Sequence, residues 1–453
     1  MSSRPTRRLF LVRTIAAGIA VLARRVAGIF TGRPYVPEVA AQEATSVGSP
    51  ISVTHGPFLG HLTPSSVRVW ARCPEPGRYS LVAHGPGAEL VAVAEAKREN
   101  DDTIVWDLSG LEPSTRYRYE IRRDERTIFS APDASFTTTP PQGVPSIIRL
   151  AIGSCAREQD GDRAVWRRMA ALDPHAVVLL GDCPYIDSTD LTVQRRRYGE
   201  FAAVTEFSDL LRSRPLYATW DDHDFGANDT NGLLLGKENS QQVFREYHAN
   251  PSYGDGREGI YTKFRMSGVE FFLLDTRYFA ATARSPIADG PTLLGAAQWE
   301  WLREGLMASD APFKVLASGL IWNGAVRPGK PDHWDTYREE REAIFRFLGD
   351  EGISGIVLMG GDIHRTRVLR YETRELAGYP LTELITSPIH SGVIVEANAP
   401  HPALIHDSGE PHAFLFMTVD TTVNPPTLHA RFENAEGREL YSLTLNSAEL
   451  TAA

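Results

Sequence analysis

The residues best suited to chemistry lie together in TWDDHDFGAND, at positions 219–229. This stretch holds four carboxylates, one histidine and one asparagine. Neighbouring carboxylates raise one another's pKa and oppose folding unless positive charge lies among them. A solvated acidic loop is the simplest alternative, but Trp220 and Phe225 are side chains that prefer the interior. The Asp-His-Asp triplet within the stretch can bind hard cations and transfer protons.

Three further polar motifs each follow an apolar run that is typical of a buried strand: Gly153-Ser154-Cys155, Gly181-Asp182-Cys183-Pro184-Tyr185 and Gly361-Asp362-Ile363-His364. Segments with helical spacing, such as DRAVWRRMAAL, alternate with these runs and indicate an α/β fold. Open α/β sheets bind ligands beyond the carboxyl ends of their strands. We therefore expect the four motifs to meet at one edge of the sheet.

In this order the motifs resemble the calcineurin-like metallophosphoesterase pattern, whose usual form is Asp-x-His, Gly-Asp-x-x-Asp, Gly-Asn-His-Asp/Glu and Gly-His-x-His. The departures are a cysteine in the first motif, a tyrosine three residues after the aspartate of the second motif, an aspartate in place of asparagine, and Asp-x-His at the end. This set is similar to the alkaline phosphatase D family over roughly residues 50–445, with WDDHDFGAND as its most specific part. The resemblance implies a layered α/β/β/α metallophosphoesterase sandwich preceded by a small all-β sandwich domain.

The resemblance also implies two kinds of cation, Fe(3+) and Ca(2+), held by Cys155, Asp182, Tyr185, Asp222, Asp362 and His364. A thiolate and a phenolate are strong donors that favour a highly charged transition metal. Ligands that offer only oxygen suit calcium better than zinc, and Asn228 is a further candidate of this kind. The assignment between Asp221 and Asp222 stays open. Cations among the carboxylates would remove the repulsion that the acidic stretch creates.

Hydrolysis of phosphate esters by a metal-bound hydroxide is the activity that the family implies. His223 is the candidate acid for the leaving group, oriented by Asp224 or Asp187. We expect His223 and Asp224 to be catalytic. His390 either lines the site or is a structural residue at a strand end.

Two residues are candidates for substrate binding, Arg277 and Asn228. The planar guanidinium of Arg277 suits a phosphate oxygen, but Arg277 and Asp275 also have the composition of a structural ion pair. Segments 233–257 and 323–334 are rich in polar and aromatic residues and are expected to rim an open site.

Only three cysteines occur in the chain, so disulfides cannot be the main support of this fold. Cys73 is expected to be an inert buried thiol. Cys155 and Cys183 have a disulfide as their alternative to metal binding.

The chain has 453 residues, of which 42% are hydrophobic, and a net charge of −10. This length predicts more than one domain, and the acidic balance gives no sign of a nucleic-acid surface. We assign residues 1–45 to a signal and tether, 46–138 to a fibronectin III-like β-sandwich, 139–147 to a linker and 148–447 to the catalytic domain.

The segment TRRLFLV resembles a twin-arginine export signal. It predicts a partner in the export machinery and a periplasmic, cell-surface or secreted protein. A cationic tail without an export role is the alternative.

Small phosphoesters are the expected substrates of an alkaline phosphatase or phosphodiesterase. One alternative is a phosphodiesterase of phospholipase D or teichoic-acid type. A second is a non-catalytic binding protein that a metal stabilises, because a structural metal site closes its coordination shell whereas a catalytic one keeps a position for water.

Overall fold

The computed structural model describes residues 52–452, which form one compact unit. The predicted signal at 1–45 lies outside the described residues. Two sheets make the N-terminal all-β part, in the orders β1-β2-β5 and β4-β3-β6-β7. Their strands are β1 (His55–Leu62), β2 (Ser66–Arg72), β3 (Gly77–His84), β4 (Leu90–Ala96), β5 (Thr103–Ser109), β6 (Arg116–Arg123) and β7 (Arg126–Thr137).

A six-stranded mixed sheet follows, in the order β10-β9-β8-β18-β19-β20. Strands β8, β9 and β10 are parallel, whereas β18, β19 and β20 add antiparallel partners. The bounds are β8 (Ile147–Gly153), β9 (Ala176–Leu180), β10 (Leu216–Thr219), β18 (Ala413–Asp420), β19 (Thr427–Asn434) and β20 (Glu439–Asn446).

The third layer of strands is a seven-stranded sheet in the order β11-β12-β13-β14-β16-β15-β17. Its parallel centre is β12, β13, β14 and β16. The bounds are β11 (Thr262–Met266), β12 (Val269–Leu273), β13 (Phe313–Ala317), β14 (Ile356–Gly360), β15 (Thr366–Tyr371), β16 (Leu381–Ile385) and β17 (Leu404–Ser408).

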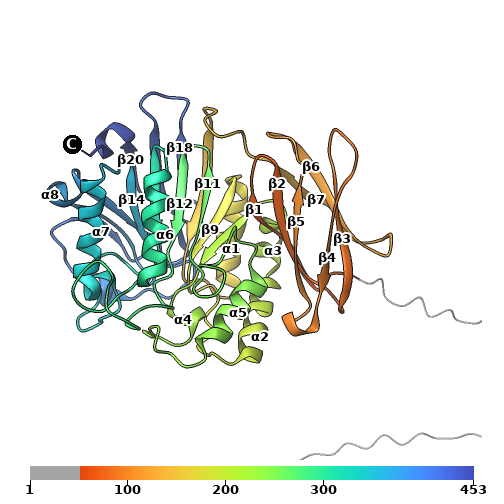
Figure 1. Cartoon of the computed structure of the whole chain (residues 1–453), viewed down its shortest axis with the longest axis horizontal. Coiled ribbons are helices and arrows are strands. Elements are labelled where there is room, and N and C mark those ends of the chain that lie inside the picture. The colour runs from red at the N-terminus through yellow and green to blue at the C-terminus, as the bar shows by residue number, and fades with distance from the viewer. Residues whose placement is uncertain (1–51, 453) are drawn as a thin grey trace, which may run out of the picture. The chain divides into compact units, whose positions relative to one another are not determined.

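Helices cover the outer faces of these sheets (Figure 1). In that view α6 and α7 lie beside β12 and β14, while α1 and α3 lie between β9 and the all-β part. The helices are α1 (Asp160–Ala171), α2 (Leu191–Ala202), α3 (Thr205–Leu211), α4 (Asp222–Phe225), α5 (Lys237–Tyr247), α6 (Gly295–Ala308), α7 (Arg338–Asp350) and α8 (Arg374–Ala377). Short 3-10 turns are η1 (Arg98–Asn100), η2 (Trp334–Tyr337), η3 (Val395–Ala397) and η4 (Ser447–Leu450).

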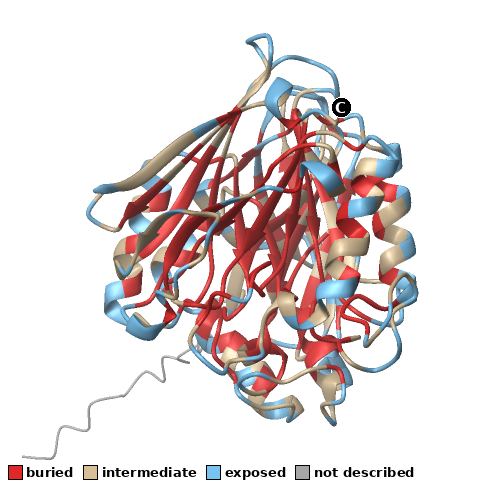
Figure 2. Ribbon diagram, turned by 90° about the vertical axis from the view of Figure 1, so that its left-hand side faces the viewer, coloured by how far each residue is buried: buried red, intermediate tan, exposed pale blue. Residues whose placement is uncertain are grey.

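The apolar strands divide their side chains between two cores, as the two-residue period of a strand requires. On β9, Val178 and Leu180 join the core shared with the seven-stranded sheet, whereas Val177 and Leu179 pack toward α1 and α3. Figure 2 shows the result, with buried residues concentrated along the strands and exposed residues on the outer helices and loops. This layering confirms the predicted α/β class and the preceding β-rich part.

The all-β part packs directly on the α/β part. Trp70 Nε1 donates a hydrogen bond of 2.7 Å to the Glu246 carbonyl, and Tyr119 donates one of 2.8 Å to the Arg212 carbonyl. The predicted linker lies in the segment between β7 and β8. Across the described residues, no helix is long and apolar enough to cross a membrane.

Candidate metal centre

The four polar motifs follow the carboxyl ends of β8, β9, β10 and β14, which belong to both mixed sheets. Backbone bonds and one side-chain contact hold these ends together. Cys155 N donates to the Gly181 carbonyl at 3.1 Å, Ile186 N donates to the His223 carbonyl at 2.9 Å, and Cys155 Sγ lies 3.7 Å from the Asp362 carbonyl. The expected convergence at one edge is therefore what the fold produces.

Several side chains of the centre sit on left-handed backbone that most residues avoid. The φ angles are 57° at Cys155, 55° at Asp182, 59° at Asp362 and 52° at His364. Such conformations cost of order 1–3 kcal/mol each and concentrate at functional sites. At these turns the chain leaves a strand and aims its side chain across the end of the sheet.

One half of the centre combines sulfur, phenol and imidazole. Cys155 Sγ lies 3.6 Å from Asp182 Oδ2, and Tyr185 Oη lies 2.8 Å from His364 Nε2. Ligand atoms of Cys155, Asp182 and His364 lie within 4.8 Å of one another. Burial, and then the nearby Asp182 carboxylate, raise the pKa of Cys155 well above its usual range. A cation would reverse this preference, because thiol ligands bind metals as thiolates.

His390 also belongs to this half. Of the two alternatives from the sequence, lining the site or a purely structural place at a strand end, its position fits the first. Its Nε2 lies 2.9 Å from Tyr185 Oη, while its Nδ1 accepts a hydrogen bond of 2.8 Å from Gly392 N. Because Nδ1 is an acceptor, a neutral His390 carries its proton on Nε2 and donates it to the Tyr185 oxygen.

The other half consists of carboxylates. Asp182, Asp221, Asp222 and Asp362 each place an oxygen within 4.8 Å of the others. Burial raises the pKa of Asp182 well above its usual range, and Asp222 adds to that effect. Within the described chain, the buried Oδ1 of Asp222 and Oδ2 of Asp221 have no hydrogen-bond partner. Orphaned carboxylate oxygens that face one another fit a hard cation.

Arg277 is fully committed to structural contacts. Its Nε donates to Asp221 Oδ1 at 2.7 Å, its Nη1 donates to the Thr230 carbonyl and to Asp332, and its Nη2 contacts both aspartates. The side chain is 1% exposed, and each of its five N–H groups has an acceptor in Asp221, Asp332 or the Thr230 carbonyl. In this arrangement the Arg277 guanidinium binds Asp221 rather than a substrate phosphate. The Asp275 carboxylate accepts a hydrogen bond from the backbone N–H of Arg277 and not from the guanidinium.

His223 lies at the rim of the centre. Its Nδ1 is 2.5 Å from Asp187 Oδ1, and its side chain is 20% exposed. Asp187 is therefore the residue that orients the ring. Asp224, the other expected partner, is buried and accepts hydrogen bonds from the backbone N–H groups of Asp221 and Cys183. Its carboxylate caps α4, so of the two partners that the sequence offered for His223, Asp187 is the one in contact with the ring.

Asn228 is exposed, and its side chain makes no hydrogen bond to any described residue. Its neighbour Asp229 contributes instead, because Asp229 N donates to Asp222 Oδ2 at 2.6 Å. The rim segment 233–257 contains the helix α5, and turns and loop flank that helix on both sides.

Two cationic residues that the sequence did not single out reach the centre. The exposed Arg157 guanidinium lies 4.3 Å from the centroid of the Tyr185 ring. Lys330 Nζ lies 2.9 Å from each oxygen of Asp362. The only sequence signal for Arg157 is its place two residues after Cys155, and Lys330 lies within a rim segment that composition had marked.

The cysteines are all buried and free among the residues described. Cys183 Sγ points to the Gly181 carbonyl at 3.2 Å, so the alternative of a disulfide with Cys155 is not what the structure has. Cys73 is a buried thiol in the all-β part, as predicted.

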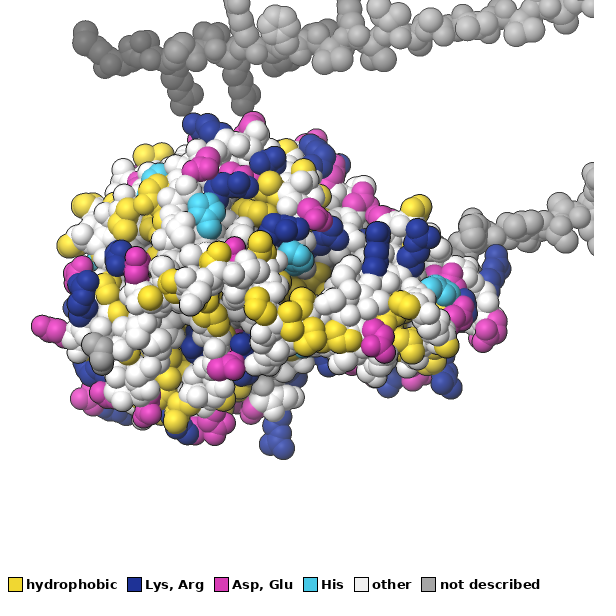
Figure 3. Space-filling model, turned by 90° about the horizontal axis from the view of Figure 1, so that it is seen from above, with side chains coloured by type: hydrophobic (Ala, Val, Ile, Leu, Met, Phe, Trp, Pro, Cys, Tyr) yellow, Lys and Arg dark blue, Asp and Glu magenta, His cyan; other side chains and the backbone are white. Residues whose placement is uncertain are grey.

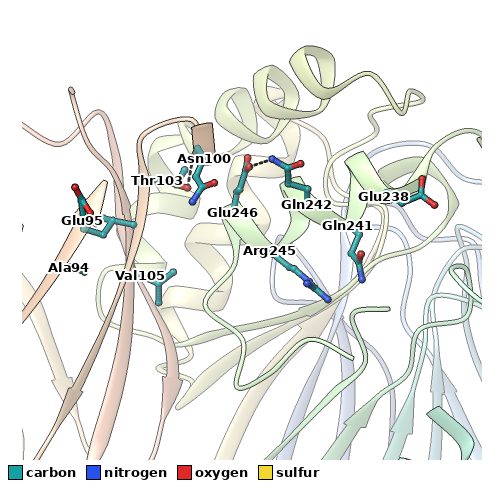
Figure 4. A pocket seen from close by; sticks show the side chains of 11 residues that line it. Ala94, Glu95, Asn100, Thr103, Val105, Glu238, Gln241, Gln242, Arg245 and Glu246 are labelled. Atoms are coloured by element: carbon teal, nitrogen blue, oxygen red, sulfur yellow. Dashed lines mark hydrogen bonds between the residues drawn. The ribbon is translucent and has the colours of Figure 1, made fainter. Parts of the chain in front are cut away.

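A polar pocket of about 380 Å³ lies elsewhere, where the all-β part meets α5. Figure 4 shows Glu246 and Gln242 joined there by a hydrogen bond, with Arg245 below them. None of the predicted site residues is among the described residues that line this pocket. On the face drawn in Figure 3, Lys and Arg side chains are interspersed with Asp and Glu.

Two mixed sheets with a cation-binding edge define a metallophosphoesterase-like fold. The family model described as PhoD-like phosphatase matches residues 150–453. The chain therefore belongs to the PhoD-like phosphatase family.

Similar proteins agree with this assignment. Alkaline phosphatase D of Bacillus subtilis (strain 168) is 24% identical over 322 residues, which are 59% of this chain and 54% of that protein. The chain thus spans about half the length of this curated relative.

Two solved structures share the fold. A structure of PhoD aligns with a TM-score of 0.69 and 19% identity, covering 87% of this chain and 93% of that one. Purple acid phosphatase PPD1 from yellow lupin (Lupinus luteus) seeds aligns with a TM-score of 0.68 and 12% identity, covering 86% and 74%.

Proposed function

We propose that this protein is a metal-dependent phosphoric ester hydrolase. The observation that carries the proposal is the division of one buried centre into two unlike donor sets. Cys155, Tyr185 and His364 offer sulfur, phenol and imidazole, whereas Asp222 and Asp362 offer only oxygen. Asp182 lies within reach of both sets. Family membership supports the same chemistry.

Iron is the cation that we assign to the first set and calcium the one that we assign to the second. A thiolate with a phenolate suits a ferric ion, and a carboxylate cage suits calcium. Such cations would draw charge from the phosphate oxygens and make water a stronger nucleophile. The unpartnered oxygens of Asp221 and Asp222 support this placement, because buried charges without partners are costly.

His223 is the group that we assign to the leaving oxygen. The contact between its Nδ1 and Asp187 leaves Nε2 free to hold a proton for the departing alkoxide. The partial exposure of His223 supports a catalytic centre over a closed structural one, and thus weighs against a purely binding protein.

Arg157 replaces Arg277 as our candidate for the substrate phosphate. It is exposed above the Tyr185 ring, whereas Arg277 is buried in ion pairs. Asn228 stays a candidate for the substrate side of the rim because it is exposed beside Asp229. We retain aryl monoesters and diesters as substrates, lipid and teichoic-acid diesters as alternatives, and export through the N-terminal signal as a proposal from sequence.

The test compares hydrolysis of a nitrophenyl monoester and the matching bis-nitrophenyl diester by the wild type and by Asp182→Asn. We expect the wild type to cleave both and Asp182→Asn to lose at least about a hundredfold in kcat/KM, because it weakens both cation positions. Asp310→Asn, at an exposed aspartate paired with Arg265, is the control. Full activity in Asp182→Asn would refute the proposal.

A further inference from the structure

Lys330 places an ammonium group inside the carboxylate half of the centre. Its Nζ lies 2.9 Å from both oxygens of Asp362 and 3.3 Å from Asp229 Oδ1. The side chain is only 6% exposed. A lysine is rarely buried this far unless it is paired, so the contact is a built feature of the fold.

The two ends of the segment that carries Lys330 are fixed in the core. Asn323 Nδ2 donates to the buried Glu383 carboxylate at 2.9 Å, and Trp334 stacks on Trp322 with ring centroids 4.0 Å apart. Between these ends the chain runs through Arg327-Pro328-Gly329-Lys330-Pro331, with φ of 80° at Gly329. In the described structure, Lys330 is the residue of this stretch whose side chain reaches the centre.

Asp362 is the ligand for which two cations would compete in this geometry. The ammonium engages both of its oxygens, although the donor set assigns Asp362 to the second cation position. A divalent ion bound there would lie beside a like charge in a buried site, where repulsion is strong. One of the two cations must therefore leave Asp362.

We propose that Lys330 is a tethered cation that holds the second cation position in the metal-free protein and yields Asp362 to a divalent ion. The inference rests on the proposed oxygen-donor cation position. Lys330 thereby sets how tightly this position binds calcium, and calcium binding releases the Lys330 side chain from Asp362, while Asp332 stays paired with Arg277.

The experiment titrates calcium chloride into the metal-free full chain by calorimetry. Lys330→Gln should bind calcium at least about tenfold more tightly than the wild type, because close charge pairs couple strongly. Arg327→Gln is the matched control, since it removes the same charge from the same segment without a side-chain contact to the described centre. Its affinity should stay within about twofold of the wild type. Unchanged or weaker binding by Lys330→Gln would overturn the inference.

Asp222→Asn separates this inference from the proposed function. Calcium binding that is lost in Asp222→Asn but unchanged in Lys330→Gln would leave the cation position standing and remove Lys330 from it. Absence of calcium binding in both the wild type and Lys330→Gln would overturn the position and the inference together.

Hydrogen exchange of the wild type gives a second readout that needs no variant. Saturating calcium should raise exchange of the backbone amides in residues 327–330, because the ammonium anchor is released while Asp332 stays paired with Arg277. Unchanged or slower exchange in this segment would contradict displacement of Lys330.

Discussion

His390 and Tyr185 show how one hydrogen bond can tune the proposed iron position. A hydrogen bond donated to a phenolate oxygen lowers the energy of the phenolate's electrons. Residues that bond to metal ligands in this way, without touching the metal, alter metal affinity by about 10–100-fold. His390→Ala should therefore shift the visible charge-transfer band of the iron-loaded protein to longer wavelength and weaken iron retention by about tenfold. Absorption spectra and dialysis against a chelator measure both effects. His401→Ala, outside the centre, is the control. An unshifted band would mean that His390 does not contact the ligand.

His223 and Asp187 provide the test of proton donation. A general acid contributes about 10²–10⁴-fold, and its loss matters most when the leaving group is poor. His223→Ala should slow alkyl phosphate hydrolysis far more than nitrophenyl phosphate hydrolysis, with metal content unchanged. Asp187→Asn should show the same pattern with a smaller loss, because it misorients the ring. Equal losses on both substrates together with lost metal would make His223 a ligand, a role that its distance from Asp182 and Asp222 permits.

Residue identity in the four motifs was predictable, because each reactive side chain follows an apolar strand at a fixed offset. The partners of these side chains were not. Asp187 and Asp224 are equally plausible partners for His223 in the sequence, and only the fold turns Asp224 onto the backbone N–H groups of Asp221 and Cys183. Lys330 sits in a Pro-Gly segment without a periodic pattern; composition marked the segment as part of the rim, but nothing local indicated that this side chain reaches Asp362.

At the scale of elements, a buried ion-pair network ties three separate segments together. Arg277 follows β12, Asp221 follows β10, and Asp332 precedes η2. The backbone at Gly319, just after β13, packs closely against Asp221: a Cβ added at Gly319 would lie 2.4 Å from Asp221 Cγ. Contacts across 55 and 56 residues explain why sequence alone paired Arg277 with its neighbour Asp275 or with substrate.

Removing the guanidinium of Arg277 should destabilise the fold. Breaking a buried pair by deleting one partner costs about 3–5 kcal/mol, so Arg277→Met should lower the free energy of unfolding by that order. Arg303→Gln, which breaks an exposed pair with Glu300, should change it by less than about 0.5 kcal/mol. Urea unfolding followed by tryptophan fluorescence measures both. A stable Arg277→Met protein with only a raised KM would restore the substrate-binding role.

At the scale of the whole molecule, the acid side of the stability profile depends on buried neutral histidines. Burial lowers the pKa of His248 to about 4 from its usual 6.5, and its Nδ1 lies 3.0 Å from the Phe244 carbonyl. The stability that the neutral ring allows is present above pH 6.5 and is lost as pH falls toward 4. For each unit by which the pH falls within this window, titration of His248 should lower the free energy of unfolding by about 1.4 kcal/mol.

His248→Gln should flatten this part of the profile. Urea unfolding at pH 7, 6 and 5, expressed relative to pH 7, measures the slope, and His429→Gln, at a partly exposed histidine, is the control. Equal slopes in His248→Gln and the wild type would show that His248 does not titrate in this window.

The order of strands and helices could be predicted from the sequence, whereas the contacts between the all-β part and the α/β part could not. Alternating apolar runs and helical spacing indicated α/β layering from residue 148 onward and short strands before it, and both are present. The hydrogen bond from Trp70 to the Glu246 carbonyl could not be predicted, because no sequence pattern in the sandwich or in α5 indicates which segment the other will contact.

Elemental analysis of the purified protein, together with its visible spectrum, is the most direct test of a centre with two unlike cations. The account predicts bound iron and calcium, and a charge-transfer band that Cys155→Ala alters as it abolishes turnover. Cys73→Ala, which removes a buried thiol from the all-β part, should leave metal content and band unchanged. A colourless, iron-free protein with full phosphoesterase activity would contradict the account.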